Sequence, residues 1–220
     1  MDSEKRTGIQ IRQTPIHKEV SIVSGGIKIA ASEKPIATNF AIKEGWLYFL
    51  LDCSGSMRKG QKLDQAKLGI IEFAKDASKK GYRLGFIRFS DEAEVLFEPT
   101  GNLDTLQNII RGLKAVGSTN MTAAIKTAHT KLKEFPGTKV IVIATDGMPD
   151  NVKSSLEAAQ RAKADGIDII SIGTEDADQE YLKKLASRTE LSSKVSSDRL
   201  AQAITDASLL LTSPKSLQIK

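Results

Sequence analysis

The chain has 220 residues, 40% of them hydrophobic, which is enough for one generous domain and too few to favour two. Its 32 lysines and arginines exceed its 27 aspartates and glutamates by only +5, and the charges are scattered, so the charge is weak evidence for polyanion binding and does not indicate an obligate nucleic-acid binder. The single cysteine, Cys53, excludes an intrachain disulfide framework and a zinc site built on two or more thiolates. The two histidines, His17 and His129, lie far apart in the sequence, so any metal must be bound mainly by oxygen.

The compartment is predicted from the same composition. No stretch approaches the roughly 18 to 20 uninterrupted apolar residues that span a bilayer, and the N-terminal segment is too polar for a secretory signal. A lone cysteine fits a reducing environment. We therefore expect a soluble, cytoplasmic protein that does not enter a membrane, and its oligomeric state stays open.

From Gly45 onward, short β-branched or aromatic runs alternate with helical patterns, which is typical of βαβ units. The predicted strands cover residues 46–51, 83–89, 93–97, 139–145, 167–172 and 194–195. The predicted helices cover residues 63–79, 103–115, 121–135, 152–164, 179–186 and 198–211. Too few residues precede 93–97 for a helical crossover, so this strand should be antiparallel. The expected fold is α/β: a doubly wound, mainly parallel sheet with one antiparallel edge strand and helices on both faces.

The remaining segments divide the chain into three parts. Residues 1–44 lack the alternation and are expected to form an N-terminal extension. Within it, Val20–Val23 and residues 27–31 could form extra strands packed on the body, on either side of Ser24 to Gly26. Residues 45–211 form the predicted domain, and residues 212–220 a loose C-terminal tail.

Three polar loops carry the chemistry, and two of them follow predicted strands. The loops are D52-C53-S54-G55-S56, G117-S118-T119-N120 and T145-D146-G147. In an open α/β sheet, ligands bind at the carboxyl ends of the strands, where these loops can meet. Together they offer two carboxylates and three hydroxyls, from Asp52, Asp146, Ser54, Ser56 and Thr119. Short oxygen side chains without nitrogen predict a site for a hard divalent cation.

The order D-x-S-G-S, then G-x-T, then T-D-G resembles the metal-ion-dependent adhesion site of von Willebrand factor type A domains, over about residues 46–211. The resemblance implies a Rossmann-like fold and a bound Mg²⁺ or Mn²⁺ with Asp52, Ser54, Ser56, Thr119 and Asp146 as ligands. It also implies that a protein partner supplies an acidic residue to the open position of the ion. Thr122 is the alternative to Thr119, but the family's threonine directly follows G-x.

Each of these residues also has a simpler interpretation. Alone, Asp52 and Asp146 could be helix caps, and both serines could be turn residues. Asp150 could bind the ion through water or only steer it. Strand alternation points Cys53 away from Asp52, into the core, and His129 is expected to make an ordinary surface contact. Arg58 and Lys59 would attract an acidic partner at the rim, or be plain solvated residues.

Other functions are weighed on the same residues. G55-S-M-R-K-G60 has the glycine spacing of a phosphate-binding loop, but Gln61 and Lys62 replace the required Lys and Ser or Thr. A dehalogenase-type phosphatase would need a second Asp where Ser54 stands, and no G-x-S-x-G supports a serine hydrolase.

We therefore expect a non-enzymatic, metal-dependent protein-binding module of an intracellular complex, for which the resemblance allows an AAA+ ATPase- or chelatase-like setting. An RNA-associated A domain is the alternative. It is not favoured, because aromatic residues make up only 5% of the chain.

Overall fold

The computed structural model describes residues 20–23, 26–29, 44–99 and 102–214, and it divides into two units, Met1–Asn39 and Phe40–Lys220. In the first unit, β1 (Val20–Val23) and β2 (Gly26–Ile29) form an antiparallel pair in which Val20 lies opposite Ile29. The expected strand at 27–31 thus begins one residue earlier, at Gly26. Ser24, Gly25 and residues 30–31 and 215–220, on which other expectations fall, lie outside the described residues.

The second unit is built on a six-stranded sheet in the order β5-β4-β3-β6-β7-β8. The strands are β3 (Gly45–Asp52), β4 (Tyr82–Phe89), β5 (Ala93–Phe97), β6 (Thr138–Thr145), β7 (Ile167–Gly173) and β8 (Ser192–Lys194). All pairs are parallel except β4 with β5, which is antiparallel at the edge. The mixed sheet with one antiparallel edge strand confirms the predicted fold class.

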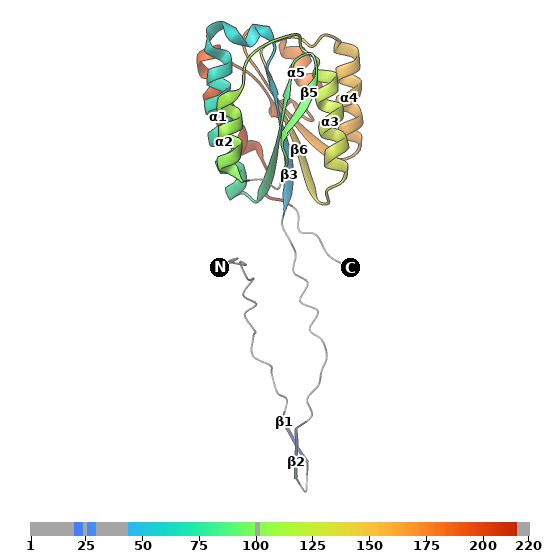
Figure 1. Ribbon diagram of the computed structural model, residues 1–220. Coiled ribbons are helices and arrows are strands. Elements are labelled where there is room, and N and C mark those ends of the chain that lie inside the picture. Colours follow the sequence, from blue (N-terminus) through green and yellow to red (C-terminus); the bar gives the residue numbers. More distant parts are fainter. Residues whose placement is uncertain (1–19, 24–25, 30–43, 100–101, 215–220) are drawn as a thin grey trace, which may run out of the picture. The chain divides into compact units, whose positions relative to one another are not determined.

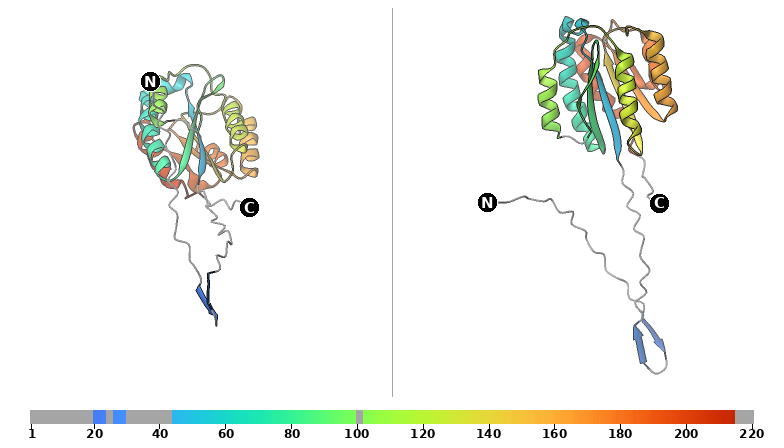
Figure 2. Two further views of the ribbon diagram at one scale, coloured as in Figure 1. Left: turned by 60° about the horizontal axis from the view of Figure 1, so that its bottom comes forward. Right: turned by 45° about the vertical axis from the view of Figure 1, so that its right-hand side comes forward.

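Helices cover both faces of the sheet (Figure 1; a second view is in Figure 2). They are α1 (Lys62–Lys79), α2 (Leu103–Gly112), α3 (Met121–Lys133), α4 (Val152–Ala164), α5 (Gln179–Leu185) and α6 (Leu200–Asp206). The buried side chains of α1, α2 and α6 form one core cluster, and those of α3, α4 and α5 form the other. No helix of the described segments is long and apolar enough to cross a membrane.

The central strand β3 shows why the sequence adopts this layered fold. All eight of its residues are buried, as a strand between two helical layers requires. Because successive side chains point to opposite faces, Leu47 and Phe49 join the core beneath α1, whereas Tyr48 and Leu50 join the core beneath α3. The continuous apolar run therefore supplies both cores at once.

Several element ends differ from the predictions. Helix α2 stops at Gly112 because Leu113 is already extended, so the expected helix end at residue 115 is wrong. The final helix is broken into a 3₁₀ turn (Ser197–Arg199), α6 and another 3₁₀ turn (Ala207–Leu210). The last strand is Ser192–Lys194 rather than 194–195. A 3₁₀ segment, η1 (Gly55–Gln61), precedes α1 and was not expected.

The strand order places the functional loops together. From β3 the chain moves outward through β4 and β5, then returns to β6 on the other side of β3. The direction of winding therefore reverses between β3 and β6, which is where open α/β sheets bind ligands. Asp52 ends β3 and Thr145 ends β6, so two of the three polar loops begin at this point.

Candidate metal centre

Asp52 forms the buried floor of the site. One of its oxygens, Oδ1, accepts a hydrogen bond from the backbone N–H of Ser54 at 2.8 Å, and Oδ2 accepts one from the Thr145 hydroxyl at 2.6 Å. Burial raises the pKa of the Asp52 carboxyl to about 6; these hydrogen bonds oppose the shift, and the neighbouring Asp146 charge adds to it. Two buried carboxylates side by side thus create a need for positive charge.

Ser54, Ser56 and Asp146 form a continuous row of oxygens above this floor. The two serine hydroxyls lie 3.0 Å apart, and the Ser56 hydroxyl donates to Asp146 Oδ1 at 2.7 Å. Neighbouring oxygens in an octahedral Mg²⁺ shell, with about 2.1 Å from metal to oxygen, lie about 3 Å from one another. A hydroxyl that donates its hydrogen to Asp146 also keeps lone pairs free for a cation. The row has the spacing of a ligand shell.

Thr119 is brought to the same edge by its backbone. Gly55 N–H donates to Gly117 O at 3.0 Å, which ties the loop before α3 to the loop after β3. Asp150 accepts from the Thr119 N–H through Oδ1, and its own N–H donates to Thr119 O, both at 3.0 Å. The Thr119 hydroxyl makes no hydrogen bond to the other four predicted ligands. The sequence suggested Asp150 as a ligand that binds the ion through water. In the structure its two hydrogen bonds hold the backbone of Thr119 in position.

Asp91, at the turn between β4 and β5, holds the same loop from its other side. Its Oδ1 accepts from the Ser118 N–H at 2.9 Å, and its carbonyl accepts from the Asn120 side chain at 3.1 Å. Gly117 has a positive φ of 78°, and a Cβ there would overlap the Asp91 carboxylate. Asn120 caps α3 by accepting from the Ala123 N–H. Sequence reasoning missed Asp91, since nothing in the local pattern marks it.

Lys62, the first residue of α1, was also missed. Its ammonium donates to Asp146 Oδ2 at 2.9 Å and to Asp176 Oδ2, and its side chain is only 4% exposed. Burial alone would lower the pKa of Lys62, but the bonds to Asp176 and Asp146 outweigh it and raise the pKa above its ordinary value. The signal was present in the sequence, because Lys62 lies on the same helical stripe as the buried Ala66 and Phe73.

The donor set fits a hard divalent cation. No three His, Cys, Asp or Glu side chains gather into a possible metal site anywhere in the described segments, so hydroxyls must complete any shell. Asp52, Ser54 and Asp146 are buried, whereas Ser56 is exposed and Thr119 is half-buried. Such a site offers oxygen ligands from below and is open to solvent above, which is the arrangement that Mg²⁺ or Mn²⁺ accepts when it keeps waters or takes a ligand from a partner.

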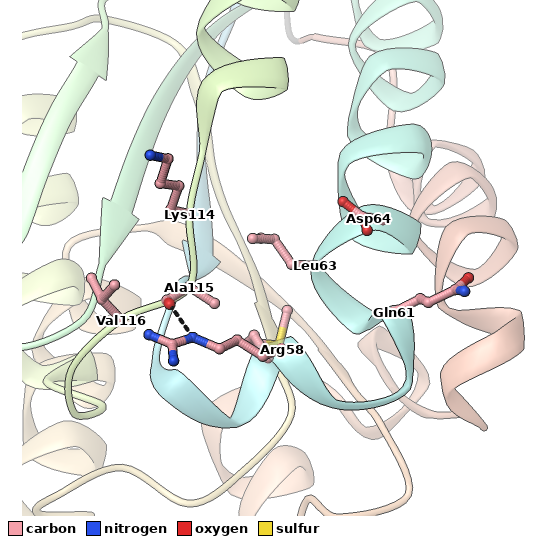
Figure 3. Close-up of a pocket in the computed structure, with 8 residues that line it drawn as sticks. Arg58, Gln61, Leu63, Asp64, Lys114, Ala115 and Val116 are labelled. Carbon is pink, nitrogen blue, oxygen red and sulfur yellow. Dashed lines mark hydrogen bonds between the residues drawn. The ribbon is translucent and has the colours of Figure 1, made fainter.

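A groove of about 440 Å³ lies between the start of α1 and residues 114–116 (Figure 3). Buried Met57 and Leu63 line it, and the Arg58 side chain crosses one end to donate to Ala115 O at 2.7 Å. Val116 on its edge is 43% exposed. Arg58 is therefore fixed at the end of this groove by a hydrogen bond, and its role in attracting an acidic partner at the metal site stays a prediction.

The two remaining sequence candidates have ordinary roles. Cys53 is fully buried in the core beneath α1, and burial, together with the nearby Asp52 charge, raises the pKa of its thiol to about 12. His129 Nε2 lies 2.7 Å from Asp165 Oδ2 on the surface. Both agree with the structural interpretation of these residues, and neither belongs to the site.

The fold is a doubly wound α/β domain whose oxygen-bearing loops meet where the sheet reverses its winding. The family of the von Willebrand factor type A domain matches residues 47–207, and the chain belongs to that family. Human von Willebrand factor A domain-containing protein 3B is 33% identical over 150 residues, covering 65% of this chain. The chain spans only 11% of the length of that relative.

Solved structures share the fold at low sequence identity. Proximal thread matrix protein 1 from the mussel byssus, in a form with a zinc-occupied adhesion motif, has a TM-score of 0.66 and 19% identity, covering 80% of this chain and 48% of its own. The manganese-loaded TRAP protein of Plasmodium vivax has a TM-score of 0.64 and 16% identity, covering 81% and 77%. Divalent metals are thus bound by proteins with this fold.

Proposed function

We propose that this domain is a non-enzymatic protein-binding module that uses a divalent cation, Mg²⁺ or Mn²⁺, to grip an acidic residue of a partner protein. Asp52, Ser54, Ser56, Thr119 and Asp146 would hold the ion. The observation that carries the proposal is the row of Ser54, Ser56 and Asp146 oxygens at 3.0 and 2.7 Å, which matches neighbouring ligands of one octahedral ion. The zinc- and manganese-bearing structures of the same fold support divalent binding.

The chemistry of this site favours an acidic partner. The bound ion would supply a positive charge with an open position, which a partner carboxylate can occupy. Buried Asp52 and Asp146 carry two negative charges, and Lys62 pairs with the charge of Asp146. The two carboxylates would therefore not cancel the full charge of the ion, and a partner carboxylate would still be attracted to it. Exposed Arg58 and Lys59 beside the site add further attraction for negative charge.

The surface around the site gives the partner apolar contacts as well. Val116 and Met148 directly neighbour the two later loops and are 43% and 42% exposed. The large hydrophobic side chains exposed in the described part of the chain are aliphatic or methionine, so none offers an aromatic platform for stacking a base. This supports a protein partner over the RNA-associated alternative.

The cellular setting is part of the same proposal. A single, buried cysteine suits a reducing compartment, and we place the module in the cytoplasm as a subunit or adaptor of an intracellular complex. An AAA+ ATPase- or chelatase-like assembly would be such a complex. The phosphate-loop alternative finds no support, because Gln61 and Lys62 replace the required Lys and Ser or Thr, and Lys62 is engaged by two carboxylates.

The metal step is tested by titrating the purified protein with Mn²⁺ and following the free ion by electron paramagnetic resonance. Thr119→Ala should lose saturable binding and retain the circular dichroism spectrum of the unaltered protein. Thr122→Ala is the matched control, because this threonine lies within α3 and should leave binding unchanged. Saturable binding that survives Thr119→Ala would refute the proposed ligand set.

The partner step is tested with displayed random peptides selected in Mg²⁺ and released with EDTA. Selected peptides should share an Asp or Glu, and changing that residue to its amide should abolish binding. The same peptides should not bind the Thr119→Ala variant. Peptides that bind equally well in EDTA would overturn the metal-bridged mechanism.

A further inference from the structure

Lys62 stands out because it is a lysine buried at the edge of the candidate metal centre. Lysine is almost never fully buried unless its charge is paired. Its side chain is 4% exposed, and its ammonium bridges two carboxylates that come from different loops, Asp146 after β6 and Asp176 after β7. The amine therefore occupies a position beside the ligand row without being one of the five predicted ligands.

The hydrogen bonds of Asp146 show how the Lys62 ammonium acts on this carboxylate. Its Oδ1 accepts from the Ser56 hydroxyl at 2.7 Å, and its Oδ2 accepts from Lys62 at 2.9 Å, so both oxygens are engaged. Asp146 is only 1% exposed, which leaves water little access to the carboxylate. A buried carboxylate with no partner would be costly, and Lys62 meets that need in the metal-free protein.

We propose that Lys62 is a built-in counter-cation of the metal centre, which keeps Asp146 in place without metal and lowers the affinity for the divalent ion. This inference rests on the proposed metal-binding function and adds its regulation. The ammonium neutralises one of the two buried negative charges that attract the ion, and it repels the ion directly. The site is then pre-assembled, and a bound ion keeps more of its positive charge for a partner carboxylate.

Asp176 has the opposite effect on the affinity for the divalent ion, because it neutralises part of the Lys62 charge. Its side chain is 63% exposed and shares the Lys62 ammonium with Asp146. When Asp176 is neutralised, the full lysine charge acts on Asp146 and on the ion. Lys62 and Asp176 thus form a pair whose two members should change metal affinity in opposite directions.

The experiment compares Lys62→Met, Asp176→Asn and the unaltered protein by Mn²⁺ titration, with Lys75→Met as a charge-matched control. Lys75 lies on the same helix, 43% exposed, and pairs with Glu72 away from the site. Lys62→Met should bind Mn²⁺ about tenfold more tightly, the order expected for removing one nearby unit charge from a partly screened site. Asp176→Asn should bind it several-fold more weakly, and Lys75→Met should match the unaltered protein.

Thermal unfolding gives a second readout that does not depend on the titration. In EDTA, Lys62→Met should melt below the unaltered protein, because Asp146 loses its cation, and Mn²⁺ should then raise its melting temperature by more than it raises that of the unaltered protein.

Three results would overturn the inference. If Lys62→Met binds Mn²⁺ no more tightly than the unaltered protein, the counter-cation role is wrong and the metal function stands. If Lys62→Met does not fold, the Asp176→Asn variant decides, since that substitution alters only an exposed side chain. An Mn²⁺ affinity equal to that of the unaltered protein would then refute the counter-cation role of Lys62. If no protein, the unaltered one included, binds Mn²⁺, the proposed function fails and this inference with it.

Discussion

Replacing Gly117 by alanine should damage the metal centre without removing any ligand. Gly117 precedes Thr119 by two residues and adopts a positive φ of 78°, a region that residues with a Cβ rarely enter. The added methyl group would also overlap the carboxylate of Asp91, which accepts from the Ser118 N–H at 2.9 Å. To relieve the overlap, Asp91 must move, and the loop that presents Thr119 loses its support.

The size of the effect follows from these two contributions. A left-handed backbone costs about 1 to 2 kcal/mol for a residue with a Cβ. Alanine recovers about 0.4 to 1 kcal/mol of this by restricting the unfolded chain, and the displaced Asp91 adds to the loss. We expect a net destabilisation of about 1 kcal/mol or more, or roughly 2 to 4 °C per kcal/mol in melting temperature for a domain of this size. Metal affinity should fall about 10- to 100-fold, as when groups that orient ligands are removed.

The assay is Mn²⁺ titration together with thermal unfolding in EDTA. Gly112→Ala is the matched control, because no atom lies within 4 Å of its added Cβ and the residue ends α2. It should leave metal affinity unchanged and stability equal or slightly higher. Asp91→Ala should share the loss of affinity without the backbone strain. Unaltered metal affinity in both Gly117→Ala and Asp91→Ala would refute the idea that this contact positions Thr119.

Three further predictions concern other parts of the domain. Gly69→Ala should destabilise the domain by about 1 to 3 kcal/mol in urea titrations, because the new Cβ would lie 2.6 Å from Ala201 O of α6. This loss should exceed the gain in helix propensity from alanine. Equal or higher stability would contradict the close packing of α1 on α6. Native Cys53 should resist iodoacetamide at pH 8 and react fully in urea, because burial raises the pKa of its thiol to about 12; rapid native alkylation would show that the thiol is accessible. Burial also raises the pKa of Asp52 to about 6, so in EDTA its stabilising contribution is complete below about pH 4 and is lost as the pH rises through 6. Compared with Asp52→Asn, the unaltered protein should therefore lose stability between about pH 4 and 6, by up to about 1.4 kcal/mol per pH unit, and parallel pH profiles of the two proteins would contradict the shift.

The strands and the loops that follow them could be predicted because their signals are local. A run such as Trp46–Leu51 is apolar throughout, as a strand buried on both faces should be, and its short length between turn signals favours a strand. Helix ends were predicted less well, since the extended Leu113 and the breaks around α6 depend on what these segments pack against. Periodicity reports that a segment has a buried face and does not report where the neighbouring layer ends.

The positioning groups of the site were harder to predict than its candidate ligands. Asp91, Asp150 and Asp176 are acidic residues in polar loops, and their types alone do not distinguish them from other surface carboxylates. Each acts on a residue 27 or more positions away, Asp91 on Ser118, Asp150 on Thr119 and Asp176 on Lys62. Lys62 could have been found from its place on the apolar stripe of α1, but its partners could not.

The sequence by itself determined the two-sided burial of the strands, the order of the oxygen-bearing loops and their place at strand ends, because these depend on residue type and on spacing within one segment. Only the tertiary structure decided that Ser54, Ser56 and Asp146 form one row of oxygens, that Asp91 and Asp150 hold Thr119, and that Lys62 shares the charge of Asp146. These contacts join residues brought together where the sheet reverses its winding between β3 and β6. A hydrogen bond or ion pair depends on distances of a few ångströms between such segments, and those distances are set by the packing of the whole domain.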